Sequence, residues 1–297
     1  MTSAPRPLAT PARPQRNVRS QRLPEGKPVT ICIAAISARP GEVPYIVNVC
    51  DTMVSGSIIS ADSTTIKIEP FHKDWLAMMA GDLTQCLPII QKAEKYFTGR
   101  ANTLATARAV FKRAFSQHLV EMREDAVLSG YGLTMKEFLR TGKRRFTENL
   151  FESICKKIAE VKANCEFIIT GFDSQKRPHI FNVTEEGKDG VYNKPGYYCI
   201  GTGKWAAETI LYTLGQSVDL NLYQTIFNVC AAKFMAEKSS DVGKATYLYA
   251  RKPGSNVFTQ VSGMIETIRG AWENDGCPRI PEGIIKALTD IYYPRCE

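Results

Sequence analysis

Short apolar runs separated by turn residues predict strands near the start of the chain. Residues 29–37 and 45–50 are apolar and rich in β-branched side chains, and residues 39–43 between them contain proline and glycine. This pattern predicts a β-hairpin. Further strands are predicted over residues 64–68 and 75–80, and the second of these ends at a Gly-Asp pair.

Apolar residues at helical spacing follow these strands. They extend over residues 82–97, where Asp82 or Thr84 can cap the helix, and over residues 102–124. Residues 125–146 contain three glycines, and this composition predicts a loop-rich insertion.

The second half of the chain repeats the succession of strands and paired helices. Its predicted elements, in order, are strands at 166–171, 179–183 and 197–200, helices at 203–214 and 221–237, strands at 245–250 and 256–260, and a helical or irregular extension at 262–297. This order lacks the regular alternation of a doubly wound fold. Two sheets covered by helix pairs fit it better, so we expect an α+β protein.

The composition is typical of a folded soluble protein. The 297 residues are 44% hydrophobic and 23% charged. No apolar run reaches the ~18 residues of a membrane-spanning helix, and the N-terminus lacks a secretory signal. The nine cysteines are scattered without a CxxC pair, which argues against a disulfide scaffold and for a reducing compartment. We expect a cytoplasmic protein without a metal, a cofactor or a membrane partner.

Positive charge is concentrated at the start of the chain. The formal net charge is +8, and residues 1–28 contribute +5 of it from six basic residues and one acidic residue. The rest of the chain is not strongly basic, so we do not expect nucleic acid as a partner. The same 28 residues include six prolines and predict a disordered tail or a removable pro-segment. A targeting signal is a third option, which the prolines disfavour.

Other catalytic and binding motifs have weak support. Residues 201–206 match GxGxxA, but the predicted helix leads into another helix, so a tight turn is a better interpretation than a pyrophosphate site. The three histidines come without GxSxG or HExxH, which disfavours a serine-triad hydrolase and a zinc peptidase. Cys50 is a weaker candidate for a thiol nucleophile.

An ordered series of short segments resembles proteasome β subunits. Residues 50–56 (CDTMVSG) resemble their aspartate-containing segment, residues 65–68 (TIKI) their lysine-containing strand, and residues 77–82 (AMMAGD) their strand-to-helix turn. Residues 169–179 are similar to their second hairpin, and residues 201–203 to their Gly-Ser-Gly turn. The resemblance covers about residues 29–260 and is greatest to bacterial and ancestral β-subunit-like members of this N-terminal-nucleophile (Ntn) hydrolase family.

The resemblance implies a four-layer αββα sandwich of two mainly antiparallel sheets, with a threonine hydrolase site. Cleavage before Thr30 would free its α-amine, with a pKa near ~7.7–8.0, as general base for its own hydroxyl nucleophile. Asp51 and Lys67 would support the hydroxyl, and Gly81 would donate a hydrogen bond to the oxyanion. Thr202 matches the supporting serine of the family.

The resemblance also implies a substrate pocket and partners. Met79 and Leu83 would face the substrate and suggest an apolar preference. We expect a peptide or protein substrate, a homo-oligomer built as a ring or stacked rings, and an ATP-dependent unfoldase as a candidate partner. The expected division of the chain is a tail at 1–28, a hydrolase domain at 29–260 with an insertion near 125–146, and a C-terminal extension at 261–297.

Two departures from the family keep a second hypothesis open. Val29 stands where the family usually has glycine, and its β-branched side chain makes the cleavage geometry harder to adopt. A further supporting aspartate and serine of the family have no fixed register among Ser239, Ser240 and Asp241. The alternative is a non-catalytic proteasome-like subunit that acts as an assembly scaffold or binds a partner. A third hypothesis is a soluble binding protein whose basic tail takes acidic partners.

Overall fold

The computed structural model describes most of the chain from Thr30 onward. The described residues are 30–55, 60–62, 66–184, 187–239, 242–255, 259–260, 262–275, 280 and 282–292. The predicted tail at 1–28 lies outside them, as do Val29, Ser240, Asp241 and the first two residues of the strand predicted over residues 64–68. In the described part of that prediction, the strand begins only at Ile68. The hypotheses about the tail therefore stay predictions.

One five-stranded antiparallel sheet contains the first predicted hairpin. Its strand order is β10-β1-β2-β11-β12. The strands are β1 (Ile31–Ser37), β2 (Tyr45–Asp51), β10 (Tyr197–Gly201), β11 (Thr246–Arg251) and β12 (Thr259–Gln260). The pairing of β1 with β2 confirms the hairpin, with Cys32 opposite Cys50.

The second five-stranded sheet is also antiparallel, and its order follows the chain. It runs β5-β6-β7-β8-β9. The strands are β5 (Ile68–His72), β6 (Trp75–Gly81), β7 (Cys165–Phe172), β8 (Pro178–Val183) and β9 (Asp189–Val191). A separate two-stranded ribbon consists of β3 (Met53–Ser55) and β4 (Ser60–Asp62).

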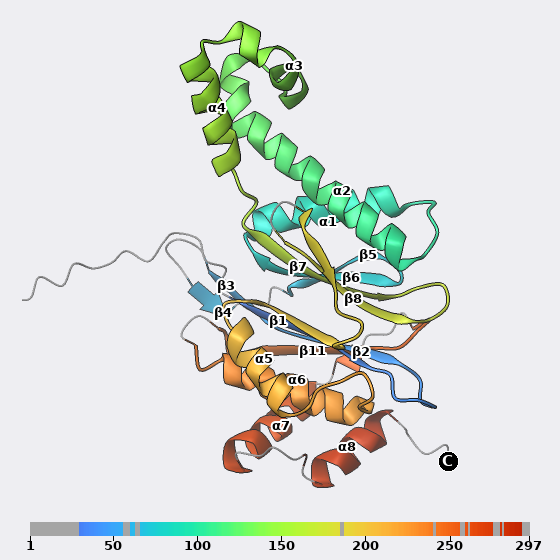
Figure 1. The fold of residues 1–297 in the computed structure, drawn as a ribbon. Coiled ribbons are helices and arrows are strands. Elements are labelled where there is room, and N and C mark those ends of the chain that lie inside the picture. Colours follow the sequence, from blue (N-terminus) through green and yellow to red (C-terminus); the bar gives the residue numbers. More distant parts are fainter. Residues whose placement is uncertain are drawn as a thin grey trace, which may run out of the picture.

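Pairs of helices cover the outer faces of the two sheets (Figure 1). Helices α1 (Leu83–Phe97) and α2 (Leu104–Arg123) share a hydrophobic core with the second sheet. Helices α5 (Lys204–Thr213) and α6 (Leu222–Ala236) share another core with the first sheet. The result is the expected four-layer αββα sandwich.

The position of strand β1 explains why its sequence does not alternate between apolar and polar residues. Every one of its residues is buried. Successive side chains of a strand point to opposite faces. Cys32, Ala34 and Ile36 pack in the core between the two sheets, whereas Ile31, Ile33 and Ala35 pack toward α5 and α6. Because both faces of the strand are covered, both sets of side chains are apolar.

The prediction of a loop-rich insertion at 125–146 was wrong over most of its length. Helix α2 continues into a π-helical turn (Glu124–Leu128) and a short 3-10 turn (Ser129–Tyr131), which lead into α3 (Met135–Arg145) and α4 (Glu148–Glu160). Together these elements form a helical arm that projects from the sandwich (Figure 1). Gly142 lies inside α3, where a Cβ would be crowded by the rings of Phe138 and Phe151. This glycine therefore allows close helix packing and does not mark a loop.

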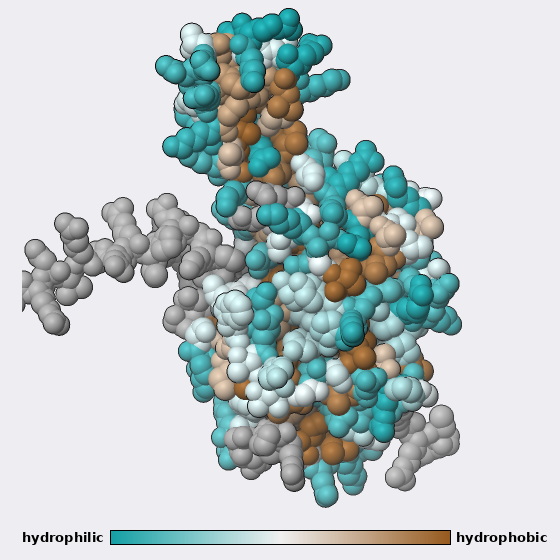
Figure 2. All heavy atoms as spheres, viewed as in Figure 1, coloured by the Kyte–Doolittle hydropathy of each residue, from teal (hydrophilic) through white to brown (hydrophobic). Residues whose placement is uncertain are grey.

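The helical arm has a small core of its own. Leu128, Leu133, Phe138 and Ile154 are buried together within it. Figure 2 shows hydrophobic residues along the arm, flanked by hydrophilic ones. One side chain of α3, Leu139, is 75% exposed.

Two further helices follow the sandwich, so the C-terminal extension is helical where the structure describes it. They are α7 (Ser262–Asp275) and α8 (Glu282–Tyr292), and both contribute apolar side chains to the core around α6. Across the described residues, every helix is too short or too polar to cross a membrane.

Candidate active site

Three of the predicted site residues meet at one end of the sandwich. Thr30 directly precedes β1, Asp51 ends β2, and Lys67 directly precedes β5. The antiparallel register of β1 with β2 places the start of the first strand beside the end of the second. The three residues are only 2%, 0% and 3% exposed, respectively. Polar groups buried to this degree must satisfy one another.

Asp51 is the centre of this cluster. Its Oδ1 accepts hydrogen bonds from the Thr30 hydroxyl at 2.5 Å, the Ile31 N–H at 3.2 Å and Lys67 Nζ at 2.8 Å. Its Oδ2 accepts a hydrogen bond from the Gly243 N–H at 3.2 Å. Lys67 Nζ also donates to the Thr30 hydroxyl oxygen. A hydroxyl held between a carboxylate and an ammonium is oriented and polarised for chemistry.

The turn after β10 brings Thr202 to the backbone of Thr30. Thr202 Oγ1 accepts a hydrogen bond from Thr30 N and donates one to the Thr30 carbonyl, each at 3.4 Å. Gly201 in the same turn has a φ of +95°, and a Cβ there would collide with the Thr30 carbonyl. Glycine is therefore required for this close approach of two segments. The GxGxxA match reflects this approach.

Gly81 ends β6 in a conformation that favours glycine. Its φ is +113°, and a Cβ would collide with the carbonyl of Asn164. The next residue, Asp82, caps α1 by accepting a hydrogen bond from the Thr84 N–H at 2.9 Å. The cap predicted at Asp82 is confirmed, and the backbone of this turn is closely constrained.

Strand β6 lies against β1 across the space between the sheets. Cys32 Sγ donates a hydrogen bond to the Met79 carbonyl at 3.4 Å. Thr30 comes two residues before Cys32, and Gly81 comes two residues after Met79. Both therefore lie at the same end of the sandwich, while the oxyanion role of Gly81 stays a prediction.

The two side chains predicted to face the substrate pack toward the helix layer. Met79 is 1% exposed and belongs to the core shared by the second sheet with α1 and α2. Leu83 is half-buried against the same core. Their role in substrate binding stays a prediction.

Burial argues against a thiol nucleophile at Cys50. The side chain is fully buried, and this burial raises the pKa of the thiol to about 12. Burial also raises the pKa of Cys32, which lies opposite on β1. A thiol that stays protonated at neutral pH is a poor nucleophile. Thr30 is therefore the better candidate at this end of the sandwich.

The sequence analysis missed two residues beside Asp51. Lys233 is a fully buried lysine on α6, and Gly243 donates its N–H to the Asp51 carboxylate. One signal for Lys233 was present in the sequence. It is the one charged residue of α6, and the other residues of this helix are apolar or uncharged. Gly243 had no such signal, because its contribution is a backbone N–H.

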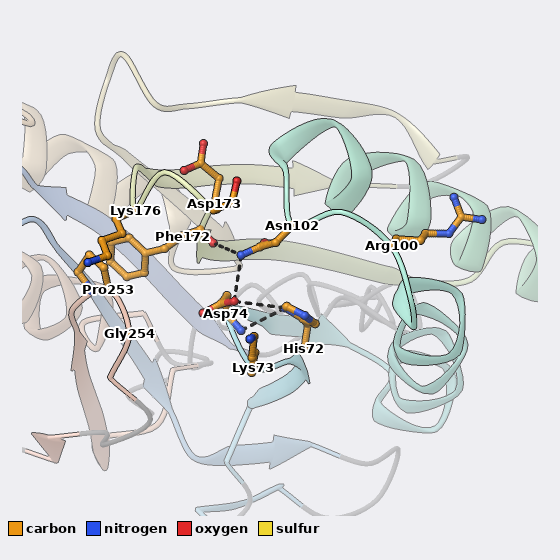
Figure 3. A pocket seen from close by; sticks show the side chains of 11 residues that line it. His72, Lys73, Asp74, Arg100, Asn102, Phe172, Asp173, Lys176, Pro253 and Gly254 are labelled. Carbon is orange, nitrogen blue, oxygen red and sulfur yellow. Dashed lines mark hydrogen bonds and ion pairs between the residues drawn. The ribbon is translucent and has the colours of Figure 1, made fainter.

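A separate pocket lies at the opposite end of the second sheet (Figure 3). Its volume is about 380 Å³, and its lining includes Asp74, Asn102 and Phe172. Asn102 Nδ2 donates to Asp74 Oδ2 at 2.9 Å and to the Phe172 carbonyl at 3.2 Å. Strand β6 runs from this pocket to Gly81, a length of roughly 20 Å. The pocket is therefore distinct from the cluster around Thr30.

The two sheets, their helix pairs and the polar cluster at one end define a fold of the proteasome-β-like Ntn type. Among solved structures, the chain is similar to Anbu (ancestral beta-subunit) from Yersinia bercovieri, with a TM-score of 0.58. The identity is 14%, over 90% of this chain and 99% of that chain. No protein-family model and no curated protein matches the sequence. The likeness confirms the expected fold, and a fold alone does not establish an activity.

Proposed function

We propose that this chain is a threonine hydrolase of peptide or protein substrates, activated by cleavage before Thr30. The observation that carries this proposal is the contact of the buried Thr30 hydroxyl with both Asp51 and Lys67. Burying a hydroxyl, a carboxylate and an ammonium at one point is costly compared with apolar side chains of similar volume. Such a cluster at a strand start is better explained by chemistry than by folding.

The reaction begins when cleavage frees the α-amine of Thr30. The amine takes the proton of the Thr30 hydroxyl, and Oγ attacks the substrate carbonyl carbon to form a tetrahedral intermediate. The N–H of Gly81 donates to the oxyanion. The intermediate then expels the substrate amine, which receives the proton from the α-ammonium, and an ester of Thr30 remains. Water hydrolyses this ester, releases the acid and restores the free threonine.

Asp51 and Lys67 prepare the hydroxyl for this reaction. The Lys67 ammonium donates to Thr30 Oγ and stabilises negative charge as it develops there. Asp51 accepts a hydrogen bond from Lys67 at 2.8 Å, which holds the ammonium in position against Thr30. Thr202 Oγ1, 3.4 Å from Thr30 N, is placed to accept a hydrogen bond from the new α-amine.

The test uses protein expressed in a native-like host. Intact mass and N-terminal sequencing show where the chain begins, and a β-lactone or epoxyketone probe shows whether Thr30 reacts. We expect a chain that starts at Thr30 and carries the probe on that residue. Thr30→Ala should abolish both processing and labelling. Thr209→Ala is the matched control, because Thr209 is an exposed residue of α5, and this variant should process normally. Unprocessed chains in an otherwise active preparation would contradict the proposal.

A second candidate function is that of a non-catalytic subunit. It is favoured by Val29, which stands at the cleavage junction where the similar family usually has glycine. This hypothesis predicts a stable oligomer that keeps residues 1–29 and forms no probe adduct. An adduct on Thr30 would eliminate it.

Both functions are compatible with a homo-oligomer. We propose a ring or stacked rings, since proteasome-like relatives assemble in this way, with an ATP-dependent unfoldase as the candidate partner of an active ring. Native mass spectrometry would measure the number of subunits. A monomer at working concentration would remove the basis for an unfoldase partner.

A further inference from the structure

A buried cation lies behind Asp51, on the face of the first sheet that α6 covers. Lys233 is the one charged residue of α6, and its side chain is 0% exposed. Burial lowers the pKa of Lys233, while the charges of Glu237 and Asp51 raise it and oppose this effect. A lysine at such a position needs acceptors for its three donor hydrogens.

Lys233 Nζ finds its acceptors on one short segment and one carboxylate. It donates to the Gly243 carbonyl at 2.7 Å and to the Lys244 carbonyl at 3.1 Å. Its third partner is Glu237, one helical turn further along the chain. The lysine therefore ties the end of α6 to the segment that leads into β11.

Helix α7 completes this arrangement from the C-terminal extension. Arg269 forms a two-pronged contact with Glu237, at 2.6 Å and 3.0 Å. The same guanidinium donates to the Lys244 carbonyl at 3.1 Å. Lys233 and Arg269 thus both donate to the Lys244 carbonyl and both bind Glu237, from two different helices.

The segment held in this way ends at the candidate active site. Gly243 accepts from Lys233 through its carbonyl and donates its N–H to Asp51 Oδ2 at 3.2 Å. The other carboxylate oxygen, Oδ1, accepts from Thr30 and Lys67. One residue therefore links the buried lysine to the carboxylate that organises the cluster.

We propose that Lys233, Glu237 and Arg269 are positioning residues for the Thr30 site. They hold residues 243–244 so that the Gly243 N–H stays on Asp51. The alternative is an ion pair that only stabilises the fold. Buried ion pairs are often replaceable by apolar residues without loss of stability, so stability alone does not account for a lysine in this apolar helix. The catalytic consequence rests on the proposed function, whereas the positioning of the segment does not.

The first experiment measures amide hydrogen exchange by mass spectrometry on the full chain. Lys233→Met suits the apolar helix and leaves Glu237 paired with Arg269. We expect at least ten-fold faster exchange in residues 242–246, with β6 and β7 unchanged. Arg269→Gln provides a second, less buried substitution with the same expected direction. Lys92→Met is the control, because this lysine pairs with Glu121 at 2.8 Å between α1 and α2, which cover the other sheet.

Two results would overturn the positioning role. One is unchanged protection of residues 242–246 in Lys233→Met. The other is an equal loss of protection in β6 and β7, which would indicate a general loss of stability.

The second experiment measures probe labelling of Thr30 as a function of probe concentration. The Gly243 N–H contacts the carboxylate that orients the Thr30 hydroxyl, not the probe. Lys233→Met should therefore lower the maximal labelling rate about ten-fold and leave the half-saturating probe concentration unchanged. An unchanged maximal rate would contradict the positioning role. A wild-type chain that is neither processed nor labelled would overturn the proposed function, and the exchange experiment would still decide the positioning of residues 242–246.

Discussion

Lys67 Nζ and Asp51 Oδ1 lie 2.8 Å apart, at positions where the side chains are 4% and 0% exposed. Asp51 ends a strand of the first sheet, and Lys67 directly precedes a strand of the second. The ion pair therefore joins the two sheets at the end of the sandwich where Thr30 lies. Removing one partner leaves a buried charge without its main compensation.

Lys67→Met should lower the free energy of unfolding by about 3–5 kcal/mol, because it strands the Asp51 carboxylate. Urea unfolding measures this loss. Lys112→Met is the control, since Lys112 pairs with Asp189 at 2.9 Å but is 45% exposed, and its loss should cost less than about 1 kcal/mol. The double variant Lys67→Met/Asp51→Asn should cost less than the sum of its single variants. Strict additivity would show that the pair is not coupled.

Gly81→Ala should strongly destabilise the fold, both because of the positive φ and because of a steric collision. A control variant with a positive φ but no collision separates the two effects. The substitution combines a φ of +113° with a collision between the new Cβ and the Asn164 carbonyl. Gly215→Ala has a φ of +66° but meets no atom within 4 Å. The control should cost about 1–2 kcal/mol, the penalty for positive φ alone, and Gly81→Ala clearly more. Equal losses in thermal unfolding would mean that the turn at Gly81 relaxes freely.

Stability at acid pH should depend on Asp173. Burial raises the pKa of this carboxyl, but hydrogen bonds from Arg177 and His179 outweigh burial and lower the pKa to about 2. The unfolded value is about 3.9, so the contribution is fully present above pH ~4 and is lost as the pH falls toward ~2. Its size is on the order of 2 kcal/mol. Asp173→Asn should flatten the pH dependence of the unfolding free energy in this window, and an unchanged slope would refute the assignment.

The helical arm should unfold locally when its small core is damaged. Phe138 is 2% exposed and packs with Leu128, Leu133 and Ile154. Phe138→Ala should cost about 3–5 kcal/mol within the arm. Amide exchange should then accelerate in α3 and α4 but not in β6 and β7. Leu139→Ala is the neighbouring control, because this side chain is 75% exposed and should change little. Faster exchange throughout the chain would show that arm and sandwich unfold together.

The sequence predicted correctly those elements that depend on residues close together in the chain. The hairpin of β1 and β2 came from two apolar runs around a turn, and the start of α1 came from the capping residue Asp82. Both depend on neighbours in sequence. The helical arm did not follow this rule. Gly142 suggested a loop, but inside α3 it makes room for the rings of Phe138 and Phe151. Only packing between helices reveals that role.

The candidate site also has one part that the sequence predicted and one part that only the structure revealed. The sequence by itself determined that Thr30 and Asp51 stand at the ends of apolar runs, because a run of buried side chains stops where the chain turns. Lys67 was predicted inside a strand, whereas it directly precedes β5. The tertiary structure decided which atoms meet. Gly243 follows Asp51 by 192 residues and donates to its carboxylate through a backbone N–H, which any residue except proline could supply. A contact of this kind leaves no side-chain pattern, so only the folded chain reveals it.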